Sequence, residues 1–264
     1  MSYFTKSTRI LVIDTETANT HDTAKGADMT DVLVYDCGFV VCDIEGNVYE
    51  TASYINRDIF FKESDLMQTA YYAAKIPQYL EGIAKGKYKV ANLWEIREAS
   101  FNLIKKYNIK FLAAYNARFD ANALNRTIQW VSKSFCRYFY QFGQIEWLDI
   151  MKMAQDTIIT TRNYKQWAID NDYLTKNGLP RKTAEMVYQY MTGEQNFEEE
   201  HTGLEDALIE VQIMAFCFSE RNRRKVKMRT LLYEKPLETC PPTDFQRNLS
   251  HNLKICPVLQ WVRE

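Results

Sequence analysis

The sequence lacks several features that would assign it to a compartment or a chemical class. It has no run of about 18 or more apolar residues, and its N-terminus lacks the apolar core of a signal peptide. Its 6 cysteines form no CxxC pair and no Cys/His spacing suited to zinc. These absences argue against a membrane protein and a zinc module. They predict an intracellular, cytoplasmic protein with reduced, mostly buried thiols.

The chain also lacks a strong charge and an internal boundary. A formal net charge of -1 over 264 residues argues against a broad basic surface that would coat long duplexes, although it leaves room for a small nucleic-acid site. No internal repeat, low-complexity tract or Pro/Gly/Ser-rich linker divides it. We therefore expect a single domain over residues 1–264, with a helical elaboration around 57–90 and a C-terminal extension around 221–264.

The sequence does contain an apolar run that leads into two acids. Residues 10–17 read ILVIDTET, and such a β-branched run predicts a buried strand in the middle of a sheet. Asp14 and Glu16 share one face of that strand, about 6.6 Å apart in rise. Because paired carboxylates resist burial, a cation is the expected partner, and oxygen ligands favour Mg²⁺ or Mn²⁺. The alternative is that Asp14 caps the next segment and Glu16 is solvated.

The rest of the chain alternates strand-like and helix-like patterns. β-Prone runs at 32–42 and 48–55 flank a turn signal and predict an antiparallel meander with the first strand. Further strands are expected at 110–115 and 146–150. Helical patterns are predicted at 65–86, where Pro77 kinks or divides the helix, and at 92–107, 121–131, 163–172 and 183–191. In the helix at 92–107, Asn92 and Glu95 predict a capping box.

Two later stretches place polar groups at helix starts. Asp120 follows the strand at 110–115, and taken alone it is an ordinary helix-start acid favoured by the dipole. Further on, Thr202 and Glu205 predict a capping box, which puts His201 and Asp206 at the two positions that meet across a helix start. Because His201 and Asp206 are polar, we expect them to face a cleft rather than the core. The alternative is that both side chains are simply exposed to solvent. The basic run at 221–229 is interpreted as a helix end rather than a phosphate contact.

Taken together, these stretches resemble the DEDDh group of 3′-to-5′ exonucleases, the DnaQ-like branch of the ribonuclease H-like fold. The first motif matches Asp14-Thr15-Glu16-Thr17, the second matches Asn116-Ala117-Arg118-Phe119-Asp120, and the third runs from His201 to Asp206 with Ala207 after it. The motifs occur in order and on the expected elements. The chain departs from the pattern in the long stretch before the second motif, in Gly203 where the family often has Ala, and in its extended C-terminus.

The resemblance implies a fold, a site and a reaction. The fold is an α/β mixed sheet, with three antiparallel strands followed by parallel strands and helices on both faces. Two Mg²⁺ or Mn²⁺ ions would be held by Asp14, Glu16, Asp120 and Asp206, with His201 as the general base. Substrate contacts would come from Thr17, Asn116 and Phe119. The expected reaction releases 5′-mononucleotides from the 3′ end of a single-stranded nucleic acid, DNA favoured over RNA, as in stand-alone exonucleases of bacteria and their phages.

Three alternatives to this function can be weighed against the sequence. Family members with the same acids include exoribonucleases and oligoribonucleases, which differ in pocket shape and 2′-OH contacts. A non-catalytic nucleic-acid-binding module is disfavoured by the complete set of acids, because buried carboxylates destabilise a fold that holds no metal. A phosphatase with an aspartate nucleophile needs a second Asp two residues on, where this chain has Glu16.

Overall fold

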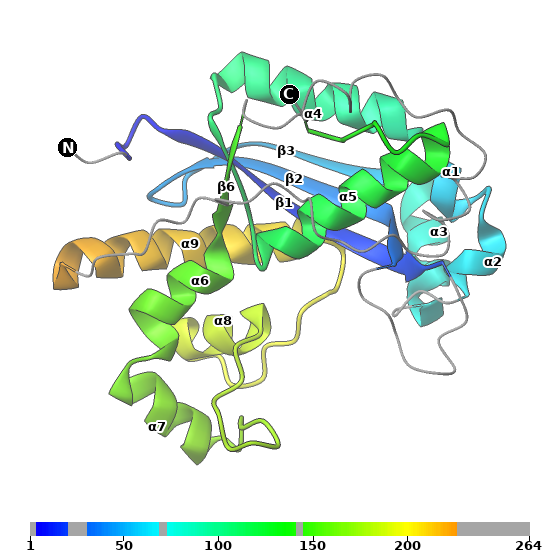
Figure 1. Ribbon diagram of the computed structural model, residues 1–264. Coiled ribbons are helices and arrows are strands. Elements are labelled where there is room, and N and C mark those ends of the chain that lie inside the picture. Colours follow the sequence, from blue (N-terminus) through cyan, green and yellow to red (C-terminus); the bar gives the residue numbers. More distant parts are fainter. Residues whose placement is uncertain (1–3, 21–30, 69–72, 141–144, 226–264) are drawn as a thin grey trace, which may run out of the picture.

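The chain is built on one mixed sheet that is covered on both faces (Figure 1). A computed structural model describes residues 4–20, 31–68, 73–140 and 145–225. The predicted C-terminal extension therefore lies outside the described residues beyond 225. No helix within the described part of the chain is long and apolar enough to cross a membrane.

Within the described residues, the sheet has six strands in the order β4-β3-β2-β1-β5-β6. β2 pairs antiparallel with both β1 and β3, whereas β5 is parallel to β1 and β6 is parallel to β5. This confirms the predicted mixed sheet. The strands are β1 (Arg9–Asn19), β2 (Val32–Asp43), β3 (Val48–Asn56), β4 (Lys89–Ala91), β5 (Phe111–Ala114) and β6 (Glu146–Asp149). The short strand β4, parallel to β3, was not predicted, since three residues are too few to show a period.

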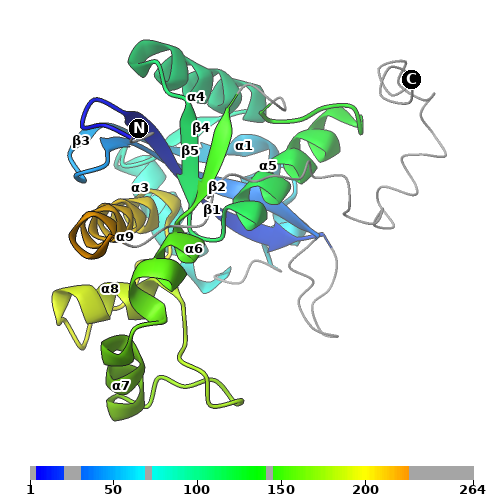
Figure 2. The same cartoon turned by 60° about the vertical axis from the view of Figure 1, so that its left-hand side comes forward.

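Helices cover the two faces of the sheet and one end of it (Figures 1 and 2). α4 (Leu93–Tyr107) and α5 (Ala117–Ser132) lie on one face, and the long α9 (Gly203–Arg224) lies on the other together with α6 (Ile150–Ala154) and α8 (Ala184–Thr192). A π-helical segment, η3 (Gln155–Ile159), leads from α6 to α7 (Arg162–Asp170). The elaboration consists of α1 (Arg57–Phe60), α2 (Ser64–Met67), the 3-10 turn η2 (Ala73–Lys75) and α3 (Ile76–Ala84), followed by β4.

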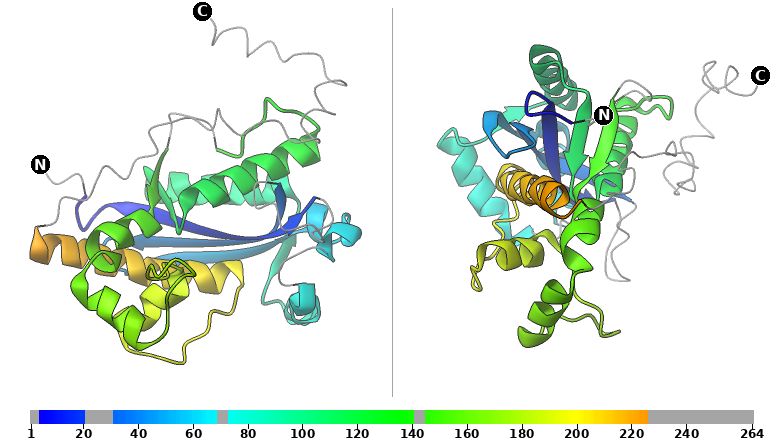
Figure 3. Two further views of the ribbon diagram at one scale, coloured as in Figure 1. Left: turned by 60° about the horizontal axis from the view of Figure 1, so that its bottom comes forward. Right: turned by 90° about the vertical axis from the view of Figure 1, so that its left-hand side faces the viewer.

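The sheet lies between helices on its two faces (Figure 3), and strand alternation divides the core into two layers. Along β1, Ile10 and Val12 point into the layer under α9, whereas Leu11 and Ile13 point into the layer under α4 and α5. This is the period of two expected for a central strand whose faces are both buried. A third cluster joins the ends of β1, β2 and β3 to the elaboration and includes Tyr79 of α3.

Local capping signals explain several helix boundaries and correct others. Asn92 caps α4, and its side chain forms the predicted capping box with Glu95. The helical pattern predicted at 65–86 is divided into the separate elements α2, η2 and α3, and the last of these begins next to Pro77, where the sequence allowed a division. Pro77 lies in the first turn of α3, where its missing N–H leaves no hydrogen bond unmade. α5 begins at Ala117, four residues before the predicted start, so Asp120 lies in its first turn.

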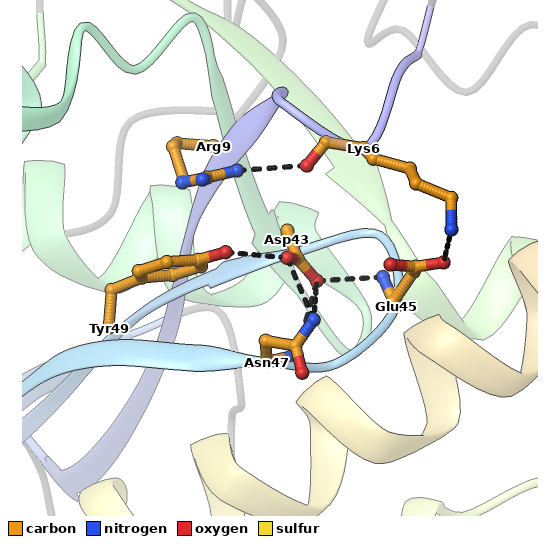
Figure 4. A network of polar contacts seen from close by, with 6 residues as sticks. All are labelled: Lys6, Arg9, Asp43, Glu45, Asn47 and Tyr49. Carbon is orange, nitrogen blue, oxygen red and sulfur yellow. Dashed lines mark hydrogen bonds and ion pairs between the residues drawn. The ribbon is translucent and has the colours of Figure 1, made fainter.

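The turn between β2 and β3 is held by the carboxylate of Asp43 (Figure 4). Asp43 accepts hydrogen bonds from the Asn47 side chain at 3.0 Å, from the Tyr49 hydroxyl at 2.8 Å and from the Glu45 backbone N–H at 2.9 Å. Burial alone would raise the pKa of Asp43, but these hydrogen bonds outweigh it and hold the pKa below its usual value. The ionised form of Asp43 therefore stabilises the hairpin.

Asp43→Asn should lower the free energy of unfolding by roughly 1 kcal/mol at pH 7, because the neutral amide accepts fewer and weaker hydrogen bonds. A depressed folded-state pKa contributes stability above the unfolded value, near 3.9, and loses it as pH falls further. The gap between wild type and variant, measured by urea denaturation, should thus shrink from pH 7 to about pH 2. Glu45→Gln, which only removes an exposed ion pair with Lys6, is the control. An equal gap at both pH values would contradict this role for Asp43.

Candidate active site

The two acids of the first motif lie within β1 rather than at its end. The strand predicted from residues 10–17 is shorter than the observed one, because β1 runs from Arg9 to Asn19. The parallel pairing with β5 stops at Val12, so Asp14 is the second residue beyond it. On the other side Asp14 pairs with Gly38 and Glu16 pairs with Asp36, and the register shifts immediately after Glu16. The acids therefore lie just beyond the end of the β1–β5 pairing, at positions that still pair with β2.

The start of α9 lies directly on the backbone of β1 and β2. A Cβ added at Gly203 would lie 2.7 Å from the Gly38 nitrogen and 3.0 Å from the Asp14 carbonyl oxygen. A Cβ added at Gly38 would lie 2.0 Å from the Gly203 carbonyl oxygen. Only glycine at both positions allows this approach. The departure from the family pattern at Gly203 thus has a packing reason, since it matches Gly38 opposite.

The start of α9 is capped differently from the prediction. Thr202 is the N-cap residue, but its hydroxyl makes no capping hydrogen bond, so the predicted capping box with Glu205 is wrong. The first backbone N–H of the helix, that of Gly203, instead donates to Asp36 Oδ2 at 2.9 Å. Burial raises the pKa of Asp36 to about 6 even though hydrogen bonds from Gly203 and Tyr79 oppose the shift. A carboxylate from a distant strand thus takes the place of the local cap.

His201 and Asp206 do meet across the helix start. The backbone N–H of His201 donates to the Asp206 carboxylate. The His201 Nδ1 atom lies 3.8 Å from Asp206 Oδ2 and 3.7 Å from Glu199 Oε2. Burial, and then the charge of Lys75, lower the pKa of His201. The imidazole is thereby kept in its neutral form near neutral pH and can act as a proton acceptor.

Asp120 approaches the acids of β1 from the α5 side of the sheet. The Thr15 hydroxyl donates to Asp120 Oδ1 at 2.8 Å, and Thr15 points to the face opposite Asp14. Asn116, the N-cap residue of α5, has a left-handed backbone with φ of 68° and makes no side-chain capping bond. Of the predicted substrate contacts, Asn116 is exposed, whereas Thr17 and Phe119 are half-buried. Their contact with a substrate stays a prediction.

The electrostatics of the cluster fit a divalent cation. Ligand atoms of Glu16, His201 and Asp206 lie within 4.8 Å of one another, and Asp14 and Asp120 are not members of that group. Burial, followed by repulsion from neighbouring carboxylates, raises the pKa of Asp14 and of Glu16 well above the usual values. Burial also raises the pKa values of Asp120 and Asp206 to about 7. Asp206 Oδ1 is buried without a hydrogen-bond partner, so this donor set suits a hard cation.

Two further acids border the cluster and were missed by the sequence reasoning. Glu210 lies one turn after Asp206 on α9, is 3% exposed and has an Oε2 atom without a hydrogen-bond partner. It is the neighbouring charge that most raises the pKa of Asp14. Burial, and then Asp206, raise the pKa of Glu199 to about 8. The spacing of Glu210 from Asp206 was the available signal, because residues four apart share a helix face.

Comparison with known proteins finds similarity only in structure. No family model matches the chain, and no curated protein matches it by sequence. A full-length 3′-exonuclease superposes with a TM-score of 0.51 at 10% identity, over 88% of this chain and 66% of that one. E. coli exonuclease I in complex with a dT13 oligonucleotide gives a TM-score of 0.48 at 15% identity, over 83% of this chain and 42% of that one. Exonuclease X in complex with 5′ overhanging duplex DNA gives a TM-score of 0.38 at 15% identity, over 84% of this chain and 96% of that one.

The superposition on the full-length 3′-exonuclease indicates the class of fold. The superposition on the 3′-exonuclease, with the mixed sheet and its two helical layers, shows that the chain has the ribonuclease H-like α/β fold that its motifs predicted. The chain spans slightly less than two thirds of that 3′-exonuclease and about two fifths of exonuclease I.

Gly203→Ala should destabilise the protein by about 1–3 kcal/mol, because its methyl group overlaps the backbone of β1 and β2. Helix propensity alone predicts the opposite sign, since Ala stabilises a helix relative to Gly by up to about 1 kcal/mol. Thermal and urea denaturation decide between the two. Calorimetric titration with Mn²⁺ should also show weakened binding, because Asp206 moves away from β1. A stabilised variant with unchanged Mn²⁺ binding would contradict the close approach described above.

Proposed function

We propose that this protein is a metal-dependent 3′-to-5′ exonuclease that acts on the end of a single-stranded nucleic acid and releases 5′-mononucleotides. The observation that carries the proposal is the gathering of the predicted residues at one end of the β1–β5 pair in a ribonuclease H-like fold. They come from β1, from the first turn of α5 and from the start of α9. The residues are Asp14, Glu16, Asp120, His201 and Asp206.

Two divalent ions, Mg²⁺ or Mn²⁺, would be held by Asp14, Glu16, Asp120 and Asp206, and would supply stabilisation of the charge that develops on the phosphate and its leaving oxygen. Oxygen donors suit both metals. Hydrogen bonds within the chain position two of these carboxylates. Thr15 holds the Asp120 carboxylate by a hydrogen bond, and the His201 backbone N–H holds that of Asp206.

His201 is proposed as the general base that takes a proton from the attacking water. Its Nδ1 atom faces the carboxylates of Glu199 and Asp206, which favours a proton on Nδ1 and leaves Nε2 as the acceptor. The lowered pKa of the ring supports a neutral acceptor at neutral pH. Thr17, Asn116 and Phe119 are proposed to contact the terminal nucleotide, because they belong to the same two motifs and are half-buried or exposed.

Single-stranded DNA is proposed as the substrate ahead of RNA. The formal net charge of -1 supports a short, local contact with one strand end rather than a broad contact with duplex phosphates. An exoribonuclease or oligoribonuclease would share the same acids, and 2′-OH contacts would set it apart. A non-catalytic nucleic-acid-binding module is less well supported, because the acids are retained with their pKa values raised by burial.

Activity is tested with matched 5′-labelled DNA and RNA strands of one sequence, supplied with Mg²⁺ or Mn²⁺. We expect progressive shortening from the 3′ end, faster on DNA, with mononucleotides as products and no reaction in excess chelator. A circular single strand should survive, because it offers no terminal hydroxyl. Cleavage of the circle would identify an endonuclease, and faster degradation of RNA would reverse the proposed preference. Binding without cleavage of any strand would favour the non-catalytic module.

His201→Ala should leave the fold and strand binding nearly intact and reduce turnover on the order of 10²- to 10⁴-fold, the usual loss for a general base. The measurements are single-turnover cleavage and calorimetric titration with Mn²⁺. His201 also lies in the group of candidate ligands with Glu16 and Asp206, so the titration separates two roles. Unchanged Mn²⁺ affinity supports the base, whereas strongly weakened affinity would make His201 a ligand. His201→Asn should not restore turnover, since an amide does not accept the proton.

A further inference from the structure

Tyr79 brings a hydroxyl group from the elaboration to the backbone of the His201 segment. Tyr79 lies on α3, is 1% exposed, and its ring packs against Tyr35, Phe60 and Tyr88. Its hydroxyl donates to Asp36 Oδ2 at 2.8 Å and lies 3.5 Å from the His201 carbonyl oxygen. The aromatic packing needs only a phenyl ring, so the hydroxyl and its buried acceptor are the specific feature.

Asp36 contacts both Tyr79 and the start of α9. The same Oδ2 atom that accepts from Tyr79 also accepts from the Gly203 backbone N–H at 2.9 Å. Asp36 is fully buried on β2 and pairs with Glu16 of β1. One carboxylate oxygen thus joins the elaboration to the first residue of α9, two positions after His201.

The backbone of His201 needs such support. Its φ of 51° is in the left-handed region, which a residue with a Cβ adopts only at a cost in free energy. Strained residues of this kind persist only where the surroundings over-determine them. Here Gly203 is fixed by Asp36, and the carbonyl oxygen of His201 itself faces the Tyr79 hydroxyl.

Other contacts from the same elaboration reach the same segment. The Lys75 ammonium donates to the carbonyl oxygen of Glu200, the residue before His201. Lys87 Nζ lies 3.8 Å from the Glu200 carboxylate and 3.5 Å from that of Glu205. Lys87 and Glu200 are exposed, whereas Lys75 and Glu205 are half-buried, so water screens these contacts and each contributes little by itself. The buried Tyr79 contact is therefore the one expected to fix the geometry.

We propose that Tyr79 is a positioning residue that, through Asp36 and the His201 carbonyl group, holds the imidazole of His201 in its working orientation. This inference rests on the proposed function, because it takes His201 to be the base. Tyr79 itself does not touch the reacting atoms. The elaboration is thereby part of the active site's support, rather than a separate addition to the fold.

The test uses Tyr79→Phe, which removes one oxygen and keeps the ring. Tyr164→Phe is the matched control, because Tyr164 is also fully buried and donates a 2.8 Å hydrogen bond, to the Arg181 carbonyl oxygen. Both variants should fold and lose similar stability. Tyr79→Phe should lower kcat about tenfold with KM and Mn²⁺ affinity unchanged, and the control should leave kcat at the wild-type value.

Placing each variant in the His201→Ala background shows whether the effect acts through His201. We expect Tyr79→Phe to have no further effect on kcat there. An undiminished tenfold loss in that background, or no loss in the wild-type background, would overturn the inference. Absence of metal-dependent cleavage by the wild type would instead overturn the proposed function.

A measurement that does not depend on activity separates a failure of this inference from a failure of the proposed function. The chain has only 3 histidines, so the ring C–H resonances of His201 are identified in NMR spectra by their loss in His201→Ala. They should shift in Tyr79→Phe and stay unchanged in Tyr164→Phe. Asp36→Asn, which weakens the shared acceptor, is a second variant that should shift the same resonances. Unchanged His201 resonances in both variants would overturn the positioning role even if the enzyme were active.

Discussion

The contact on which the candidate site depends is the backbone-to-backbone approach of α9 to β1 and β2. Gly203 and Gly38 lie so close that neither position has room for a Cβ. This approach brings the third motif, on α9, against the first motif, on β1. With a side chain at either glycine, α9 would lie farther from β1 and β2. Asp206 would then lie farther from Asp14 and Glu16. A single steric requirement thus decides whether the acids can act together.

Bringing the acids together has an electrostatic cost. Burial and mutual repulsion raise the pKa values of Asp14, Glu16, Asp120 and Asp206, and Glu210 adds a further buried carboxylate beneath them. Without compensation such a cluster destabilises the fold. Donors from the chain offset part of the cost, as Thr15 does for Asp120 and the His201 backbone does for Asp206. A bound cation would offset the remainder, which is the physical link between this arrangement and metal-dependent chemistry.

The contacts of the elaboration connect it to the candidate site, which its sequence did not indicate. As sequence it is a broken helical stretch after β3, with no motif and no clear link to the acids. In the folded chain, α3 packs against the ends of β1 and β2 and brings Tyr79 to Asp36 and to the segment before α9. The elaboration therefore contacts the segment that carries His201.

The sequence by itself determined the features that depend on local pattern. The apolar, β-branched run that opens residues 10–17 specified a central strand, and Asn92 with Glu95 specified the start of α4. The order of the motifs specified the fold class. Each of these is encoded within a few residues, by the period of a strand or by the chemistry of a helix end.

The tertiary structure alone decided how the site is held. It extended β1 to Asn19, added β4, replaced the expected cap at Thr202 with Asp36, and placed Glu210 and Tyr79 near the acids. Asp36 and Gly203 are 167 residues apart in sequence, and no local period or turn signal relates them. Their contact exists only because packing brings the two glycine backbones together. The buried Asp36 of β2 becomes a helix cap only after that packing has occurred.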